Sequence, residues 1–80
     1  MASVRIEFLV EPFSEGSPGP HVVAGIDAAR AHGLDPEVGP FGTVVVVTDD
    51  LAAAVVGDVV RAALAHGASR VALQIERTDT

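Results

Sequence analysis

The alternation of apolar and polar positions divides the chain into strands and helices. Residues 4–11 place apolar side chains at every even position and mostly charged ones at odd positions, which predicts a half-buried strand. Residues 43–48 are a β-branched run typical of a buried central strand, and residues 71–76 alternate again. A short stretch at residues 34–38 predicts another strand, joined to 43–48 by the turn Gly39-Pro40-Phe41-Gly42.

Two segments between these strands have helical character. The first has apolar residues at helical spacing, and we expect it to begin at Ser17-Pro18, an N-cap followed by a first-turn proline. It should run to about His32 and end at Gly33 in the left-handed conformation. The apolar positions are Val22, Val23, Ile26 and Ala29.

The second helix is expected to begin at Asp49 or Asp50 and to continue to His66 before Gly67. Either carboxylate can accept hydrogen bonds from the free backbone amides of the first turn and complement the helix dipole.

The resulting order β-α-β-β-α-β predicts an α+β, ferredoxin-like sandwich over a single domain, residues 1–80. This arrangement usually forms a four-stranded antiparallel sheet of order 4-1-3-2 with both helices on one face, so the second face is left bare. A short internal repeat indicates two related halves: residues 28–33 are Ala-Ala-Arg-Ala-His-Gly, and residues 62–67 are Ala-Ala-Leu-Ala-His-Gly.

Composition indicates a small domain that associates with copies of itself. The chain has 80 residues, 49% of them apolar but mostly small, and no cysteine, so self-association is the expected source of further burial. A net charge of −6 with scattered arginines argues against nucleic acid as a partner. The absence of a long apolar run and of a signal-peptide pattern argues against a membrane partner and leads us to expect a cytoplasmic protein.

The residues that enzymes usually employ are scarce. Cysteine, tyrosine and lysine are absent, and no serine lies in a Gly-x-Ser-x-Gly turn. Histidines and carboxylates do not occur at metal-ligand spacings, and the glycines do not form a phosphate-binding loop. We therefore expect a protein that is not an enzyme and has neither a metal nor a resident cofactor.

Two groups of residues are candidates for a binding site. At one end of the predicted sheet, Phe13 and Phe41 could flank a planar ring while Ser14 and Thr43 bond its polar edge; alternatively, both phenylalanines are hydrophobic plugs. The second group lies on the bare face of the first and last strands, where carboxylates could hold a cation or amine or could instead pair with Arg5 and Arg77. That group comprises Glu7, Leu9, Glu11, Gln74 and Glu76.

The histidines have mainly structural interpretations. His32 and His66 each lie in a last helical turn, where an imidazole can cap free carbonyls. His21 lies near the loop-rich end, where a ligand role is a further possibility.

The order of several short motifs resembles the thiamine-binding protein family, over roughly residues 6–75. The resemblance implies a homotetramer of sheet-packed dimers, with thiamine or its hydroxymethylpyrimidine part bound near subunit contacts. It also implies that the turn, with Gly42 and Thr43, and the loop after the first strand contribute to the pocket. The motifs are Glu7-Phe8 with Pro12, Gly33-Leu34, Gly39-Pro40-Phe41-Gly42-Thr43 and Gly67-Ala68-Ser69-Arg70-Val71.

This chain has Val46 and Val47 where the family commonly has a Glu-Gly pair, a sign of a lost or altered site. The leading hypothesis is a module that binds thiamine or the pyrimidine. The alternatives are an assembly or regulatory domain without its own ligand, and a small enzyme or accessory subunit.

Overall fold

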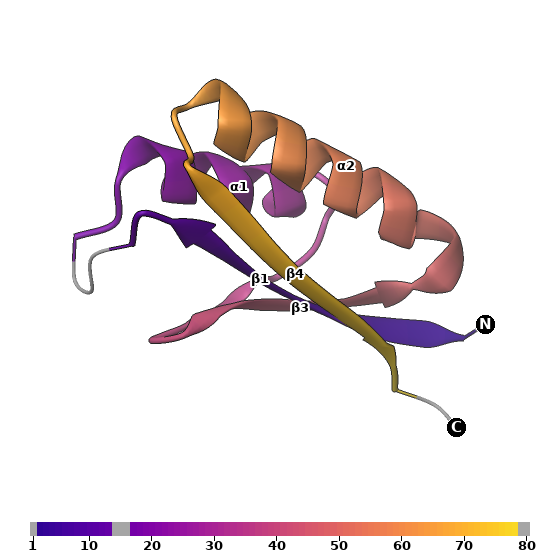
Figure 1. The fold of residues 1–80 in the computed structure, drawn as a ribbon. Coiled ribbons are helices and arrows are strands. Elements are labelled where there is room, and N and C mark those ends of the chain that lie inside the picture. Colours follow the sequence, from indigo (N-terminus) through magenta and orange to yellow (C-terminus); the bar gives the residue numbers. More distant parts are fainter. Residues whose placement is uncertain (1, 14–16, 79–80) are drawn as a thin grey trace.

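The computed structural model describes residues 2–13 and 17–78 and has two layers, a sheet and a pair of helices on one of its faces (Figure 1). All neighbouring strands are antiparallel, and the strand order is β2-β3-β1-β4. The predicted ferredoxin-like fold and strand order are confirmed. The elements are β1 (Ser3–Glu11), α1 (Pro20–Arg30), β2 (Glu37–Gly39), β3 (Gly42–Thr48), α2 (Asp49–Ala65) and β4 (Arg70–Arg77).

The central strand β1 organises the core because it pairs with β3 on one side and with β4 on the other. Phe8, which is 2% exposed, lies between Thr43 of β3 and Leu73 of β4. Every even position of β1 from 4 to 10 is buried against the helices, as the alternation predicts.

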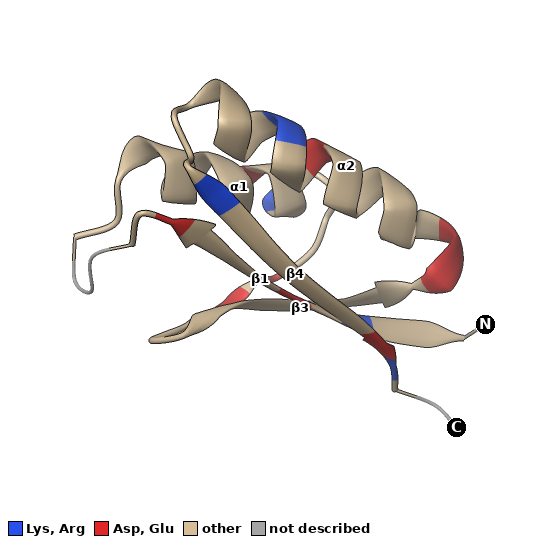
Figure 2. Ribbon diagram, viewed as in Figure 1, with Lys and Arg blue, Asp and Glu red and all other residues tan. Residues whose placement is uncertain are grey.

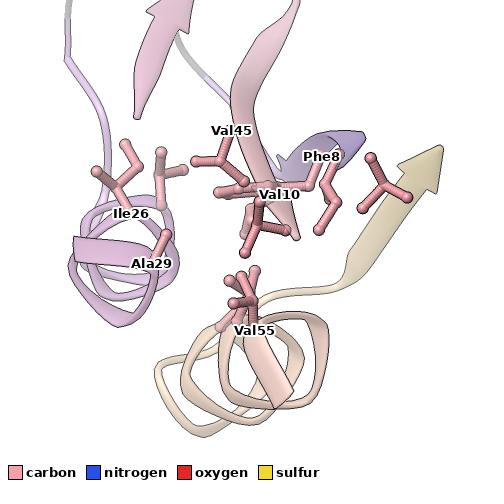
Figure 3. Close-up of a cluster of buried hydrophobic side chains, with 12 residues drawn as sticks. Phe8, Val10, Ile26, Ala29, Val45 and Val55 are labelled. Carbon is pink, nitrogen blue, oxygen red and sulfur yellow. The ribbon is translucent and has the colours of Figure 1, made fainter. Parts of the chain in front are cut away.

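Each helix contributes one apolar stripe to this core. Figure 3 shows side chains of α1 and α2 directed toward the sheet, with Ile26 and Ala29 on one helix and Val55 on the other. Most of these side chains are small. The buried helix positions are Val22, Gly25, Ile26 and Ala29 in α1 and Val55, Val59 and Ala63 in α2.

The first helix begins later than the sequence predicts. Its N-cap is Gly19 and its first residue is Pro20, so the expected start at Ser17-Pro18 is wrong. A proline is favoured at the first helical position wherever it occurs, and Pro18 and Pro20 both offered that signal. At the other end, the predicted left-handed Gly33 is confirmed by its φ of 77°.

The second strand is shorter than predicted, since β2 covers only Glu37–Gly39. Pro36 explains the difference, because it has no backbone N–H and restricts the residue before it, so it disfavours ladder pairing at residues 34–36. The start of α2 also differs in detail. Thr48 is its N-cap, and no side chain caps the free amides, although Asp49 and Asp50 lie in the first turn.

The face of the sheet opposite the helices is bare in the described part of the chain, as predicted. Charged side chains of β1 and β4 occupy one part of it, and valines of β3 occupy another. Val46 is 55% exposed there, whereas its neighbour Val47 is buried at 6%. Among the described residues, neither helix is long and apolar enough to cross a membrane.

The turn before β3 depends on a glycine. Gly42 has a φ of 153°, and a Cβ at this position would lie 3.0 Å from the carbonyl oxygen of Phe8. We predict that Gly42→Ala lowers the free energy of unfolding by about 1–3 kcal/mol in urea denaturation.

Gly57→Ala is the matched control, because a Cβ at Gly57 in α2 meets nothing within 4 Å. Alanine should there raise stability by about 0.5–1 kcal/mol through its higher helix propensity. Equal effects of the two substitutions would contradict the conformation assigned to the turn.

Candidate functional site

A hollow of about 260 Å³ lies on the bare face of the sheet. Its floor comes from the paired strands β1 and β4, and the turn between β2 and β3 contributes an aromatic ring at its side. Its lining residues are Glu7, Leu9, Phe41, Ala72, Leu73 and Gln74.

The polar groups of the hollow are held opposite each other by strand register. Glu7 of β1 pairs with Gln74 of β4, and Leu9 pairs with Ala72 beside them. Arg5 lies 3.6 Å from the Glu7 carboxylate and 3.5 Å from that of Glu76, so its charge is shared between them. The arrangement offers a carboxylate acceptor next to an amide that both donates and accepts, above an apolar floor.

Phe41 is unusual because its large apolar ring is 83% exposed. It lies in the tight turn between β2 and β3, where it does not pack into the core. The interpretation of Phe41 as a hydrophobic plug is therefore wrong. Its ring is available to contact a molecule in the hollow.

Phe13 has the opposite environment. It packs against the core and lines a separate hollow with Val22 and Ile26 of α1, on the helix side of the sheet. The plug interpretation holds for Phe13. The two phenylalanines consequently lie on different faces of the sheet and do not flank one ring.

The remaining predicted site residues divide between these faces. Thr43 is only 4% exposed and shares the helix side with Phe8, so its hydroxyl is not part of the bare-face hollow. Gly42 lies next to Glu7, because a Cβ there would lie 3.7 Å from Cγ of Glu7, but it does not line the hollow. Ser14 lies outside the described residues. Sequence reasoning missed Ala72, which the alternation of the last strand places on the same face as Gln74.

The hollow on the helix side is larger but chemically plain. It has a volume of about 390 Å³, and none of its lining side chains ionises. It therefore lacks a carboxylate or amide side chain to select a polar heterocycle. Its lining comprises Phe13, Pro18, Val22, Ile26, Val38, Gly39 and Pro40.

The family comparison matches almost the whole chain. Residues 6–80 match the model of the thiamine-binding protein family. The chain belongs to this family. No curated protein matches the sequence.

Solved structures of similar fold support the architecture. A domain of unknown function from Bacillus cereus is 24% identical with a TM-score of 0.71, and the alignment covers 100% of this chain and 79% of that one. A protein from Thermotoga maritima, named as a candidate thiamine biosynthesis/salvage protein, is 22% identical with a TM-score of 0.67, covering 94% and 81%. A hypothetical protein from Methanocaldococcus jannascii is 20% identical with a TM-score of 0.71, covering 100% and 82%.

In this member of the thiamine-binding family, Arg70 has a structural partner. Its guanidinium donates to the carboxylate of Glu11, and Ser69 donates to the Glu11 carbonyl at 3.1 Å, so the two residues join the end of β1 to the beginning of β4. Arg70, which is part of the motif at residues 67–71, therefore does not line the bare-face hollow.

The three histidines have partners outside that hollow. His66 Nδ1 bonds the Ala62 carbonyl at 2.8 Å and caps α2 as predicted, and His21 Nε2 bonds the carbonyl of Pro12. His32 differs from the prediction, because it donates to Asp58 of α2 at 2.7 Å in place of a helix-end carbonyl. Among residues 2–13 and 17–78, no group of histidines and carboxylates could hold a metal ion.

The His32 contact links the end of α1 to α2. The pKa of the Asp58 carboxyl lies below its usual value of 3.8. The hydrogen bond from His32 is the largest cause, and the hydrogen bond from Arg61 at 2.6 Å is the second. Because the folded-state pKa is lowered, the resulting stabilisation is present above the unfolded pKa and is lost as the pH falls through the folded pKa.

We predict that Asp58→Asn lowers stability at pH 7 and that the difference from the native chain shrinks as the pH falls below about 4. Urea denaturation of both proteins at pH 7, 5 and 3 measures this. Asp35→Asn is the control, because Asp35 has no ion-pair partner within the described chain. An Asp58→Asn effect independent of pH would show that the carboxylate is not the stabilising group.

Proposed function

We propose that this protein binds thiamine or its hydroxymethylpyrimidine part in the bare-face hollow and does not transform it. The observation that carries the proposal is the register pair of Glu7 and Gln74 over the floor of Leu9 and Ala72, beside the exposed ring of Phe41. The family is named for binding, which agrees with a role as a carrier or sensor.

The chemistry of the ligand suits these groups. An aminopyrimidine is planar and presents an exocyclic amine beside a ring nitrogen, so the amine can donate to the Glu7 carboxylate while the Gln74 amide donates to the ring. Phe41 can stack on the heterocycle. The thiazolium cation of thiamine would be favoured by the Glu7 carboxylate and by the chain's net charge of −6.

The size of the hollow suggests that a second chain completes it. Its volume of about 260 Å³ is just below the usual range of roughly 300–1,000 Å³ for ligand pockets, and it opens to solvent on the sheet face. A homotetramer of sheet-packed dimers would close this opening. The exposed Val46 and the half-buried Val44 provide apolar surface for such packing.

Val46 and Val47 are the basis of an alternative function. If Val46 and Val47 mark a lost site, the bare face serves only assembly, and the protein is an oligomeric or regulatory domain without its own ligand. That residues 1–80 form a single domain, and that the protein is cytoplasmic, remain predictions from the sequence.

We predict a thermal shift with either compound. A ligand at about 100 times its Kd adds roughly 2.7 kcal/mol, which for a domain of this size raises the Tm by about 10–20 °C. Glu7→Gln should reduce the shift strongly, because it replaces the carboxylate acceptor with a neutral amide. Glu37→Gln, at an exposed position in β2, should leave it unchanged. No shift from a well-folded oligomer would favour the assembly function.

Phe41→Ala separates ligand contact from folding. Because the ring is 83% exposed, its loss should leave the Tm of the free protein nearly unchanged. Loss of stacking worth about 0.5–1.5 kcal/mol should weaken binding roughly 2- to 10-fold by isothermal titration. Val38→Ala, at a 53% exposed position on the helix side, is the matched control and should bind as the native chain does. Equal losses of affinity in both variants would show that Phe41 does not contact the ligand.

A further inference from the structure

The bare face of the paired strands β1 and β4 carries an ion pair at each end of the hollow. Arg5 lies opposite Glu76 in the register, and its guanidinium is 3.5 Å from the Glu76 carboxylate. At the other end, Glu11 lies opposite Arg70 and accepts a hydrogen bond from its guanidinium, where the acidic end of β1 meets the basic start of β4 (Figure 2). The lining residues of both strands lie between these two ion pairs.

The charged side chains around the hollow leave it negative. Glu7 in the lining and Glu76 beside it share the single guanidinium of Arg5, so this end carries one uncompensated negative charge. The pair of Glu11 and Arg70 adds no net charge. An anion at that end would have to compete with Glu11 for the guanidinium of Arg70. The hollow therefore favours a cation or a neutral group over an anion.

The other arginines are also engaged with carboxylates. The chain has 5 basic residues, all of them arginines, and each lies 3.5 Å or less from a carboxylate oxygen. A phosphate would have to displace a carboxylate to reach any of them, and exchanging one anion for another gains little. The three pairs away from the hollow are Arg30 with Asp27, Arg61 with Asp58 and Arg77 with Asp49.

Helix N-termini, which commonly bind phosphate, do not serve the hollow either. The first turn of α2 contains Asp49 and Asp50, whose carboxylates already complement the helix dipole. The beginning of α1 lies on the helix side of the sheet, where Pro18 and Val22 line the other hollow. Within the described part of the chain, the bare-face hollow thus has neither a free basic side chain nor a helix N-terminus for a phosphate.

We propose that the hollow accepts thiamine or hydroxymethylpyrimidine as the free alcohol and excludes the phosphate ester of either compound. Both compounds carry one primary alcohol, and a phosphate on it adds a charge of about −1.5 to −2 at pH 7. This inference rests on the proposed function, because that function places the pyrimidine beside Glu7 and Gln74. It adds a selectivity that the ion pairs of the bare face impose.

The strand geometry brings these charges close to the ligand. Side chains on one face of a strand repeat about every 6.6–6.8 Å, so the pair of Arg5 and Glu76 lies one step from Glu7. A phosphate directed along the strands to this end meets the carboxylates of Glu7 and Glu76. Towards β3, the register partner of Glu7 is Val44, whose apolar side chain cannot replace the water around a phosphate.

This selectivity relates the protein to phosphoryl transfer. The bound alcohol is the substrate of a phosphotransferase or the product of a phosphatase. Formation of the ester adds negative charge beside the Glu7 carboxylate, so phosphorylation of the ligand would release it from the hollow. The protein therefore holds its ligand only in the unphosphorylated form.

Isothermal titration with hydroxymethylpyrimidine, thiamine and the monophosphate ester of each tests the selectivity. At low salt each ester should bind at least about 10-fold more weakly than its alcohol, because it brings negative charge beside a carboxylate. The difference should narrow as added salt screens these charges. Equal affinity, or tighter binding of the esters, would overturn the inference and leave the proposed function standing. Binding of none of the four compounds would contradict the proposed function and the inference together.

Glu76→Gln tests whether the local charges produce the selectivity. The Glu76 side chain is 70% exposed, so the variant should fold, and it releases Arg5 from one of its two carboxylates. The ratio of alcohol affinity to ester affinity should fall roughly 3- to 10-fold.

Asp35→Asn is the matched control, because it removes the same charge from an exposed position before β2, at the edge of the sheet opposite β4. The affinity ratio of this variant should equal that of the native chain. An unchanged ratio in Glu76→Gln, or an equal fall in both variants, would overturn the inference that the ion pairs beside the hollow exclude the ester.

Discussion

The alternation of β1 is the constraint on which the rest of the molecule depends. This strand is central, so its even positions bury side chains beneath both helices while its odd positions fix what the bare face presents. A shift of one residue in its pairing would move Phe8 to the bare face and Glu7 into the core. Core stability and the chemistry of the hollow are therefore set by the same register, and neither can change without the other.

This coupling explains how a chain of 80 residues with a core of mostly small side chains can still present a defined site. The carboxylate of Glu7 and the amide of Gln74 lie opposite each other because β1 and β4 are in register, and β1 is anchored through its buried face. Phe41 is positioned by the turn, whose Gly42 backbone approaches Phe8. The helix-side hollow has no polar side chain in such a fixed arrangement.

Most of the fold could be predicted from the spacing of apolar residues and from the residues at turns. A strand with one buried face has alternating apolar and polar residues, so it can be recognised in the sequence. The start of α1 could not, since Pro18 and Pro20 satisfy the same positional preference. The faces of Phe13 and Phe41 could not either, because loop residues do not follow the strand alternation. The place of Thr43 beside the turn predicts that it belongs to the site, but its register opposite Phe8 directs it toward the core. The sequence does not show which backbone groups of β4 are unpaired, because this depends on the strand order and on the hydrogen bonds between β1 and β4.

The central claim is that the ligand occupies the bare face and not the helix side. Titrating the ¹⁵N-labelled protein with hydroxymethylpyrimidine while recording amide chemical shifts tests this most directly. Binding on the bare face should give saturable shifts at Glu7, Leu9, Phe41 and Gln74, with Val22 and Ile26 unchanged. Shifts confined to Val22, Ile26 and Val38 would place the ligand in the other hollow and contradict the account.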